Sequence, residues 1–256
     1  MKISVLQMDV GLNSPDKNYE KAKELIKTAV KESPDVLVLP ETFNVGFLPS
    51  DIDFSKCDVD GARTKKEIGG LAKEYGVNIV AGSVANKKGD NFYNTAYVFN
   101  RQGECVFEYD KAHLFSSMDE DKYFKNGEKT GSFLLDNIRC TLLICYDIRF
   151  PELIREVTTK ETVDYIFIVS EWPKERINTL KTLVMARAIE NRAFAVCANG
   201  CGTAKGIKYG GNSMIVSPMG DVMSRCFDNE GIAFAQCNAE LLKTARKTEV
   251  FKDIKR

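Results

Sequence analysis

Residues 138–155, Ile-Arg-Cys-Thr-Leu-Leu-Ile-Cys-Tyr-Asp-Ile-Arg-Phe-Pro-Glu-Leu-Ile-Arg, decide the fold and contain the most informative reactive side chain. The apolar run that ends at Cys145 predicts a buried strand, and Pro151 marks the first turn of a helix. Between them, Cys145 is followed by the polar pair Tyr146-Asp147, so the thiol lies where the strand opens into a loop. A backbone N–H just after the cysteine can there face a developing oxyanion. A core thiol without a chemical role is the alternative interpretation.

Short buried strands and longer helices alternate on both sides of this stretch. Residues 36–39 and 165–169 are continuously apolar, which is typical of strands covered on both faces. Residues 180–192 are rich in Leu, Met, Ala, Arg and Glu and predict a helix. This alternation predicts an α/β sandwich. No linker rich in Pro, Gly or Ser divides the chain, so we expect a single domain over residues 1–256.

Two further strand ends carry reactive side chains. Glu41 lies in Leu-Pro-Glu-Thr-Phe, directly after residues 36–39, and Lys111 lies in Tyr-Asp-Lys-Ala-His-Leu-Phe. The lysine follows a predicted hairpin made of residues 95–99 and 105–109. Taken singly, each side chain is more often an ordinary solvated charge. Their common position after apolar strands makes them candidates for one site.

Composition excludes several classes of function. The 36 Lys and Arg balance 36 Asp and Glu, so no general attraction draws the chain to nucleic acid or to an anionic membrane. No run approaches the roughly 20 apolar residues that span a bilayer, and the first residues lack a signal peptide. Eight cysteines without an export signal indicate reduced thiols and a cytoplasmic protein. One histidine and no Cys-x-x-Cys pair argue against a metal site.

Together, the Glu41, Lys111 and Cys145 segments resemble the nitrilase superfamily of carbon-nitrogen hydrolases, in that family's order and over essentially the whole chain. Further matches are Glu-Trp-Pro at 171–173, Ala-Arg-Ala-Ile-Glu-Asn at 186–191 and Ser-Pro-Met-Gly at 217–220. Within the family the chain is most similar to the omega-amidase branch. The resemblance implies a four-layer α-β-β-α sandwich and a homodimer formed through helices flanking the nucleophile and through the C-terminal segment.

The same resemblance implies the catalytic roles. Cys145 is the nucleophile, Glu41 the general base and Lys111 the catalytic lysine, and no metal or organic cofactor is needed. An ammonium near the thiol favours thiolate, and the base that takes the thiol proton can return it to the leaving amine. Lys111 and the Tyr146 N–H would hold the oxyanion. The family's second glutamate matches Glu120.

Alternatives remain open around Glu120. Asp119 or Asp121 could take its place in this acid-rich stretch, or the glutamate could be an ordinary loop charge. His113, two residues after Lys111, offers a rival Cys145-His113 mechanism, although a histidine bonded behind the site is favoured.

Substrate contacts are expected near the nucleophile. Arg149 could anchor a substrate carboxylate, or could pair with Glu152 three residues later. Trp172 and Phe43 are candidate pocket walls, with aromatic core packing as the default.

The predicted reaction is hydrolysis of a small-molecule amide to a carboxylic acid and ammonia, and the resemblance favours an omega-amide of a dicarboxylate such as 2-oxoglutaramate. An N-carbamoyl amine or a nitrile is the alternative substrate class for the same residues. A catalytically idle binding homologue is the alternative from another class, and the intact Glu41, Lys111 and Cys145 speak against it.

Overall fold

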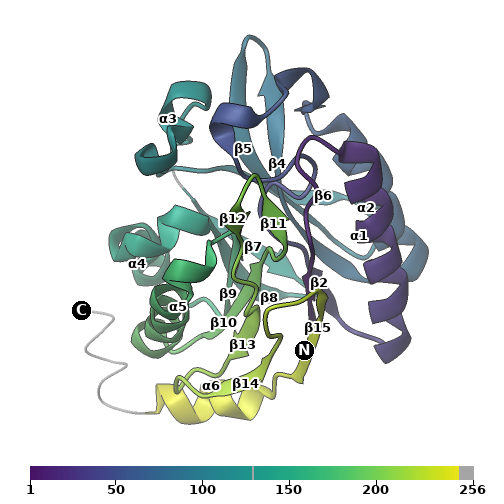
Figure 1. Ribbon diagram of the computed structural model, residues 1–256. Helices are drawn as coiled ribbons and strands as arrows, with labels where there is room; N and C mark the ends of the chain where they lie inside the picture. The colour runs from purple at the N-terminus through teal and green to yellow at the C-terminus, as the bar shows by residue number, and fades with distance from the viewer. Residues whose placement is uncertain (129, 248–256) are drawn as a thin grey trace.

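A computed structural model describes residues 1–128 and 130–247. The N-terminal half of the chain, together with the last strand β15, forms one mixed sheet (Figure 1). Strands β1, β2 and β4 run parallel at its centre, and antiparallel strands flank them. The strand order is β15 (Gly231–Gln236), β1 (Lys2–Gln7), β2 (Val36–Val38), β4 (Asn78–Lys88), β5 (Asn91–Phe99) and β6 (Cys105–Asp110), and the short β3 (Asp58–Val59) pairs with β4.

The second sheet comes from the C-terminal half and has the same design. Its central strands β8, β9 and β10 are parallel. Its order is β14 (Val222–Arg225), β13 (Met214–Val216), β10 (Phe194–Asn199), β9 (Tyr165–Ser170), β8 (Ile138–Ile144) and β7 (Ser132–Leu135). The chain passes from the second sheet back to the first at its end: β14 lies at the edge of the second sheet, and the next strand, β15, pairs with β1 at the edge of the first.

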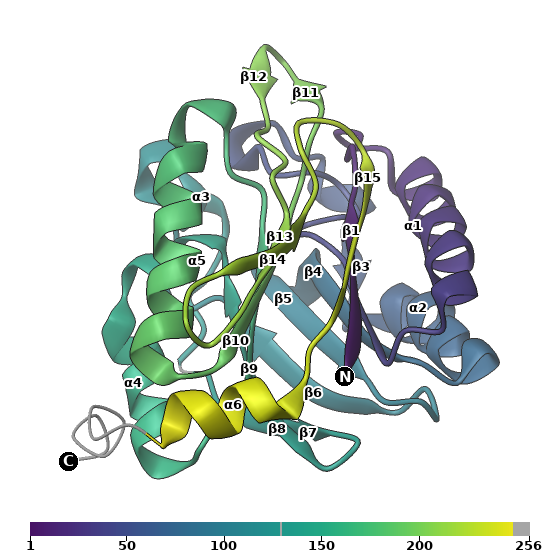
Figure 2. The same cartoon turned by 90° about the horizontal axis from the view of Figure 1, so that it is seen from below.

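Helices cover the outer face of each sheet (Figures 1 and 2). Helices α1 (Pro15–Ala29) and α2 (Ala62–Tyr75) lie outside the first sheet, and α4 (Pro151–Lys160) and α5 (Ile177–Asn191) lie outside the second. Helix α6 (Ala239–Arg246) follows β15 at one end of the sandwich. The layers therefore run helix, sheet, sheet, helix, and the predicted α-β-β-α sandwich is confirmed.

Alternating side chains explain why the strands read as continuously apolar. In β2, Val36 and Val38 point into the core between the two sheets, whereas Leu37 packs in the core beneath α1 and α2. All three side chains are fully buried. A strand that contributes to two cores needs an apolar residue at every position, and this is why its sequence shows no alternation.

Several elements differ from the sequence-based expectation. Strand β4 continues to Lys88, well past the apolar residues that mark its start. Helix α2 was not predicted, because Gly69 and Gly70 weaken the helical signal in its middle. Gly69 lies against the Phe99 ring and leaves no room for a larger side chain without a shift. The hairpin of β11 (Thr203–Ala204) and β12 (Ile207–Lys208) was also not predicted.

In the described residues no helix is long and apolar enough to cross a membrane.

Candidate active site

Three strand ends converge where the two sheets meet. Glu41 follows β2, Lys111 follows β6, and Cys145 follows β8. The Lys111 Nζ lies 2.9 Å from Glu41 Oε1, and both side chains are fully buried. The backbone of Glu41 also bonds to the second sheet, since its N–H donates to the carbonyl of Ser170 at the end of β9. The fold thus brings together the three side chains that the sequence placed after apolar strands.

Lys111 makes a second buried ion pair, with Glu120. Its Nζ lies 2.8 Å from Glu120 Oε2 and 3.0 Å from Oε1. The Asn94 side chain ties the two carboxylates together, because its Nδ2 donates to Glu41 Oε1 at 2.8 Å and to Glu120 Oε1 at 3.1 Å. Burial lowers the pKa of Lys111, but the carboxylates of Glu120 and Glu41 raise it by more, and the net shift is upward. Lys111 is therefore a permanent cation held between two acids.

Glu120 is held in place from the backbone as well. Its Oε2 accepts the N–H of Phe115 at 2.6 Å. Burial and the nearby Glu41 carboxylate raise the pKa of Glu120 against the lowering effect of Lys111. The competing acids do not reach the site: Asp119 pairs with Lys122 at the surface, and Asp121 is exposed. Of the three acids, Glu120 alone contacts Lys111.

The second oxygen of Glu41 bonds to the segment after β9. Glu41 Oε2 accepts the backbone N–H of Glu171 at 2.9 Å, so both carboxylate oxygens have fixed partners. The Glu41 backbone is positioned by a close approach: a Cβ at Gly82, which has φ +60°, would lie 1.9 Å from the carbonyl oxygen of Pro40. Only glycine fits at that position.

Cys145 has a strained backbone, with φ +48°. Asp147 fixes the turn around it: its Oδ2 accepts the N–H of Ile144 at 3.1 Å and the hydroxyl of Tyr109 at 2.8 Å. Its Oδ1 accepts the N–H of His113 at 2.9 Å. A buried carboxylate with three such donors locks the loop that presents the thiol.

Electrostatics at the thiol differ from the expectation. Burial, followed by the carboxylate of Glu41, raises the pKa of Cys145 well above its usual range, and the lowering effect of Lys111 does not compensate. The sequence-based argument that a nearby ammonium favours thiolate is thus outweighed, because Lys111 is already shared by two carboxylates. The resting side chain is a neutral thiol that needs a base.

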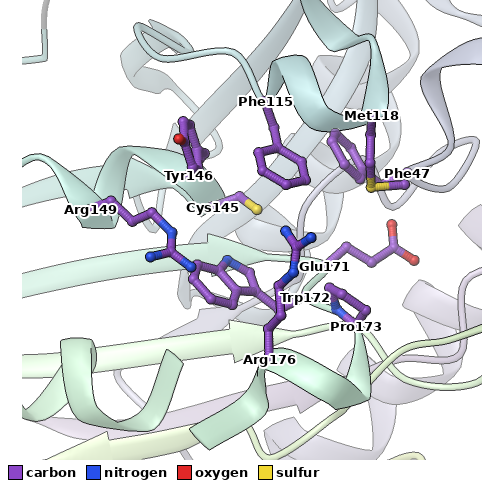
Figure 3. A pocket seen from close by; sticks show the side chains of 10 residues that line it. All are labelled: Phe47, Phe115, Met118, Cys145, Tyr146, Arg149, Glu171, Trp172, Pro173 and Arg176. Atoms are coloured by element: carbon purple, nitrogen blue, oxygen red, sulfur yellow. The ribbon is translucent and has the colours of Figure 1, made fainter. Parts of the chain in front are cut away.

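A small, open cleft lies in front of Cys145 (Figure 3). Aromatic rings and two arginines dominate its lining, which consists of Phe47, Phe115, Met118, Cys145, Tyr146, Arg149, Glu171, Trp172, Pro173 and Arg176. Among the described residues no group of three or more His, Cys, Asp or Glu is placed to hold a metal ion.

The predicted substrate contacts divide into two groups. Tyr146, Arg149 and Trp172 line the cleft. The guanidinium of Arg149 lies over the Trp172 ring, 4.8 Å from its centroid, and within the described ranges it forms no ion pair with Glu152. Phe43 does not line the cleft: it is fully buried and packs edge-on against Tyr19 beneath α1. The residue after β2 that does line the cleft is Phe47, four positions after Phe43.

His113 lies behind the nucleophile loop. Its ring stacks on Phe150 at 3.7 Å between centroids, and its Nδ1 lies 3.1 Å from Asp147 Oδ1. These contacts match the favoured interpretation of a histidine bonded behind the site, and not the Cys/His pair.

Besides the cleft residues Phe47 and Arg176, three residues that hold the catalytic groups were missed: Asn94, Asp147 and Glu171. Asp147 and Glu171 lie inside the quoted motifs, so their position beside Cys145 and Trp172 was a usable signal. Asn94 sits within a strand and carries no signal in the sequence.

Comparisons with known proteins agree with this geometry. The chain is 40% identical to the "2-oxoglutaramate amidase" of Bacillus subtilis (strain 168), over 99% of this chain and 97% of the relative. It is 27% identical to "Omega-amidase NIT3" of Saccharomyces cerevisiae, over 96% and 90% of the two chains. The structure of XC1258 from Xanthomonas campestris, described as a CN-hydrolase superfamily protein, superposes with a TM-score of 0.92 at 26% identity, covering 99% of this chain and 96% of that one. Since the carbon-nitrogen hydrolase family model also matches residues 2–247, the chain belongs to this family and is a carbon-nitrogen hydrolase.

Proposed function

We propose that this hydrolase cleaves small amides through a thioester on Cys145, with Glu41 as general base and Lys111 as electrostatic partner. The observation that carries the proposal is the buried 2.9 Å contact between Lys111 and Glu41 beside the thiol. A fully buried ion pair beside a thiol that lines a cleft is costly to maintain, and catalysis is the simplest reason for it.

The chemistry begins with a proton transfer. Glu41 takes the proton from the neutral Cys145 thiol as the sulfur attacks the amide carbon, and a C–S bond forms. Negative charge then moves to the amide oxygen, where the Lys111 ammonium and the Tyr146 N–H stabilise it. Glu41 returns the proton to the nitrogen, the C–N bond breaks and ammonia leaves. Water, deprotonated by Glu41, hydrolyses the thioester and restores the thiol.

Glu120 would act as an auxiliary residue in this scheme. Both of its oxygens accept hydrogen bonds from Lys111 Nζ, which helps to hold the ammonium in place. Because Asn94 bonds to both carboxylates, the three charged groups belong to one hydrogen-bonded network.

The proposed substrate is an omega-amide of a dicarboxylate such as 2-oxoglutaramate. The 40% identical relative named for that amide supports this, as does the position of Arg149 in the cleft, where it can receive a remote carboxylate. An ammonia-release screen over omega-amides, N-carbamoyl amines and nitriles tests the assignment. Faster turnover of either alternative class would replace it.

The decisive variant is Cys145→Ala. It should lose turnover while its thermal unfolding stays unchanged, and intact-protein mass spectrometry should trap an acyl adduct on wild type only. Acylation by substrate is a better probe than alkylation, since a neutral thiol reacts slowly with iodoacetamide. Turnover in Cys145→Ala within tenfold of wild type would reject the mechanism, and a folded wild type without turnover would favour the idle binding homologue.

We also propose that the chain forms one domain and acts as a cytoplasmic homodimer. The eight cysteines are all unpaired, which fits a reducing compartment. Ile189 on α5 and Met219 next to it are large apolar side chains that are 43% and 50% exposed, and they offer a contact near the helices that flank the nucleophile. Part of the predicted C-terminal contact, residues 248–256, lies outside the described residues. Sedimentation equilibrium tests the assembly.

A further inference from the structure

Two arginines reach the cleft from different segments of the chain. Arg149 comes from the turn after Cys145, and Arg176 comes from the turn before α5. Figure 3 shows both guanidinium groups directed toward the space in front of the Cys145 sulfur. Both side chains are exposed at the mouth of the cleft, so a substrate that enters must pass between two positive charges.

Each guanidinium is held by an aromatic ring rather than by an acid. Arg149 lies over Trp172 at 4.8 Å, and Arg176 lies over Phe115 at 4.9 Å. Within residues 1–128 and 130–247 neither of them forms an ion pair. A guanidinium stacked on a ring keeps its N–H donors in its own plane, where they are free to bind a carboxylate in a bidentate manner.

A third donor lies between them. The Trp172 side chain is only 4% exposed, and its Nε1 is buried without a hydrogen-bond partner in the described structure. Figure 3 shows this ring nitrogen on the side of the indole that faces Cys145. A buried N–H that lacks an acceptor in the free protein is expected to receive one from a ligand.

The cleft offers no negative charge to a cationic ligand. Glu171 is the one acid among its lining residues. Burial, and then the carboxylate of Glu41, raise the pKa of Glu171 well above its usual range and favour its neutral form. Its Oε1 is buried and without a partner, as expected of a site that lacks a stabilising cation. An ammonium group would therefore meet two arginines and no carboxylate.

We propose that Arg176 is a second anion anchor, which forms a clamp with Arg149 around the remote carboxylate of the substrate while Trp172 Nε1–H donates to an oxygen next to that carboxylate. The inference rests on the proposed amidase function and specifies its substrate: an amide with an unshielded carboxylate and a neighbouring oxo or hydroxyl oxygen, without an ammonium group. Arg176 is thus a specificity residue, and the reaction itself does not require it.

A charge series of amides tests the clamp. Wild type and Arg176→Gln are assayed with glutarate monoamide, neutral pentanamide and 5-aminopentanamide, which carries an ammonium where the first has a carboxylate. We expect Arg176→Gln to raise KM for glutarate monoamide by about 10-fold or more, the scale of losing one charged partner, with kcat within a few-fold. KM for pentanamide should stay unchanged, and Arg176→Glu should favour 5-aminopentanamide over glutarate monoamide.

Lys174 provides the matched control. It is a cation on the same turn as Arg176, but it pairs with Asp228 and does not line the cleft. Lys174→Gln should leave all three KM values unchanged. An equal effect of Lys174→Gln and Arg176→Gln would show that only the general field matters, and equal losses on charged and neutral amides would show that Arg176 only supports the Phe115 wall. Either result would overturn the clamp.

The indole donor is tested separately with Trp172→Phe, which keeps an aromatic ring and removes the N–H. The preference for 2-oxoglutaramate over glutarate monoamide, as a ratio of kcat/KM, should fall about 5-fold, the usual effect of one hydrogen bond. An unchanged ratio would remove Trp172 from the proposal. A wild type that hydrolyses all of these amides without regard to charge would refute the clamp alone, whereas a folded wild type that hydrolyses none of them would refute the proposed function itself.

Discussion

Replacing Lys111 by Met tests how the buried charges support each other. The ammonium lies 2.9 Å from Glu41 and 2.8 Å from Glu120, and all three side chains are fully buried. Removing one partner of a buried pair costs about 3–5 kcal/mol, because the charge that remains has no partner. Here two carboxylates remain, with Asn94 as their shared donor. We therefore expect a loss in the upper part of that range, which is a large fraction of the roughly 5–15 kcal/mol typical of a folded protein.

The pH dependence separates this cause from a simple cavity. Burial already raises the pKa of Glu120, and without Lys111 the lowering effect of the ammonium is lost, so the folded-state pKa of Glu120 rises further and folding takes up a proton. A group whose pKa is raised by folding stabilises the protein at low pH and loses that contribution as the pH rises. The deficit of Lys111→Met should therefore grow by about 1.4 kcal/mol per pH unit for each proton taken up.

Urea unfolding of wild type and variant at pH 6, 7 and 8 measures this slope, with circular dichroism as the readout. The double variant Lys111→Met/Glu120→Gln is the matched control, because it removes one of the two uncompensated acids. It should recover part of the stability and none of the amidase activity. A deficit that does not depend on pH, or a double variant less stable than Lys111→Met, would refute the argument.

Three further predictions follow from single contacts. Glu41→Gln should lower kcat/KM by roughly 100-fold or more, the scale of general acid-base catalysis, and His113→Asn by much less; the reverse order would favour the Cys/His mechanism. Burial raises the pKa of Glu171, so wild type must take up a proton to fold and becomes less stable as the pH rises. Glu171→Gln has no such proton to take up and should gain stability relative to wild type between pH 5.5 and 8. A difference in Tm that stays constant over this range contradicts the argument. Gly82→Ala should lose both activity and stability, because the added Cβ would collide with the Pro40 carbonyl. Gly89→Ala is the control: it has φ +57° but open space around it, so it should lower the free energy of unfolding only by the roughly 1–2 kcal/mol of a left-handed backbone. Equal losses in Tm would exclude the steric cause.

The strand ends could be predicted from the sequence because burial leaves a local mark. Apolar runs that end at a reactive residue make Glu41, Lys111 and Cys145 candidates, and the resemblance to a known family supplied Glu120. Phe43 shows the limit of this reasoning. An aromatic residue two positions after Glu41 can face either the cleft or the core beneath α1, and only the backbone turn between them decides. Phe47, the residue that lines the cleft, lies further along the same turn.

Long-range polar contacts leave no such mark. Asn94 is separated by 53 residues from Glu41 and by 26 from Glu120, and it bonds to both. Its neighbours in β5 give no sign that an amide is needed there. Arg176 was missed for a different reason: it lies on a turn where exposed charges are common, and only the approach of the Phe115 and Trp172 segments makes it part of a cleft.

The charge balance of the site also explains why the thiol rests in its neutral form. Lys111 forms ion pairs with both Glu41 and Glu120, and the backbone N–H of a third acid, Glu171, donates to Glu41. A thiolate would add one more negative charge to a buried site next to the Glu41 carboxylate, so burial and Glu41 keep the proton on Cys145. The sulfur then becomes nucleophilic only when Glu41 takes its proton during attack, and the oxyanion that forms is the new charge that Lys111 can stabilise. A site of this kind makes the reactivity of the cysteine depend on the arrival of an amide carbonyl, which is the condition for hydrolysing substrate while resisting unrelated electrophiles.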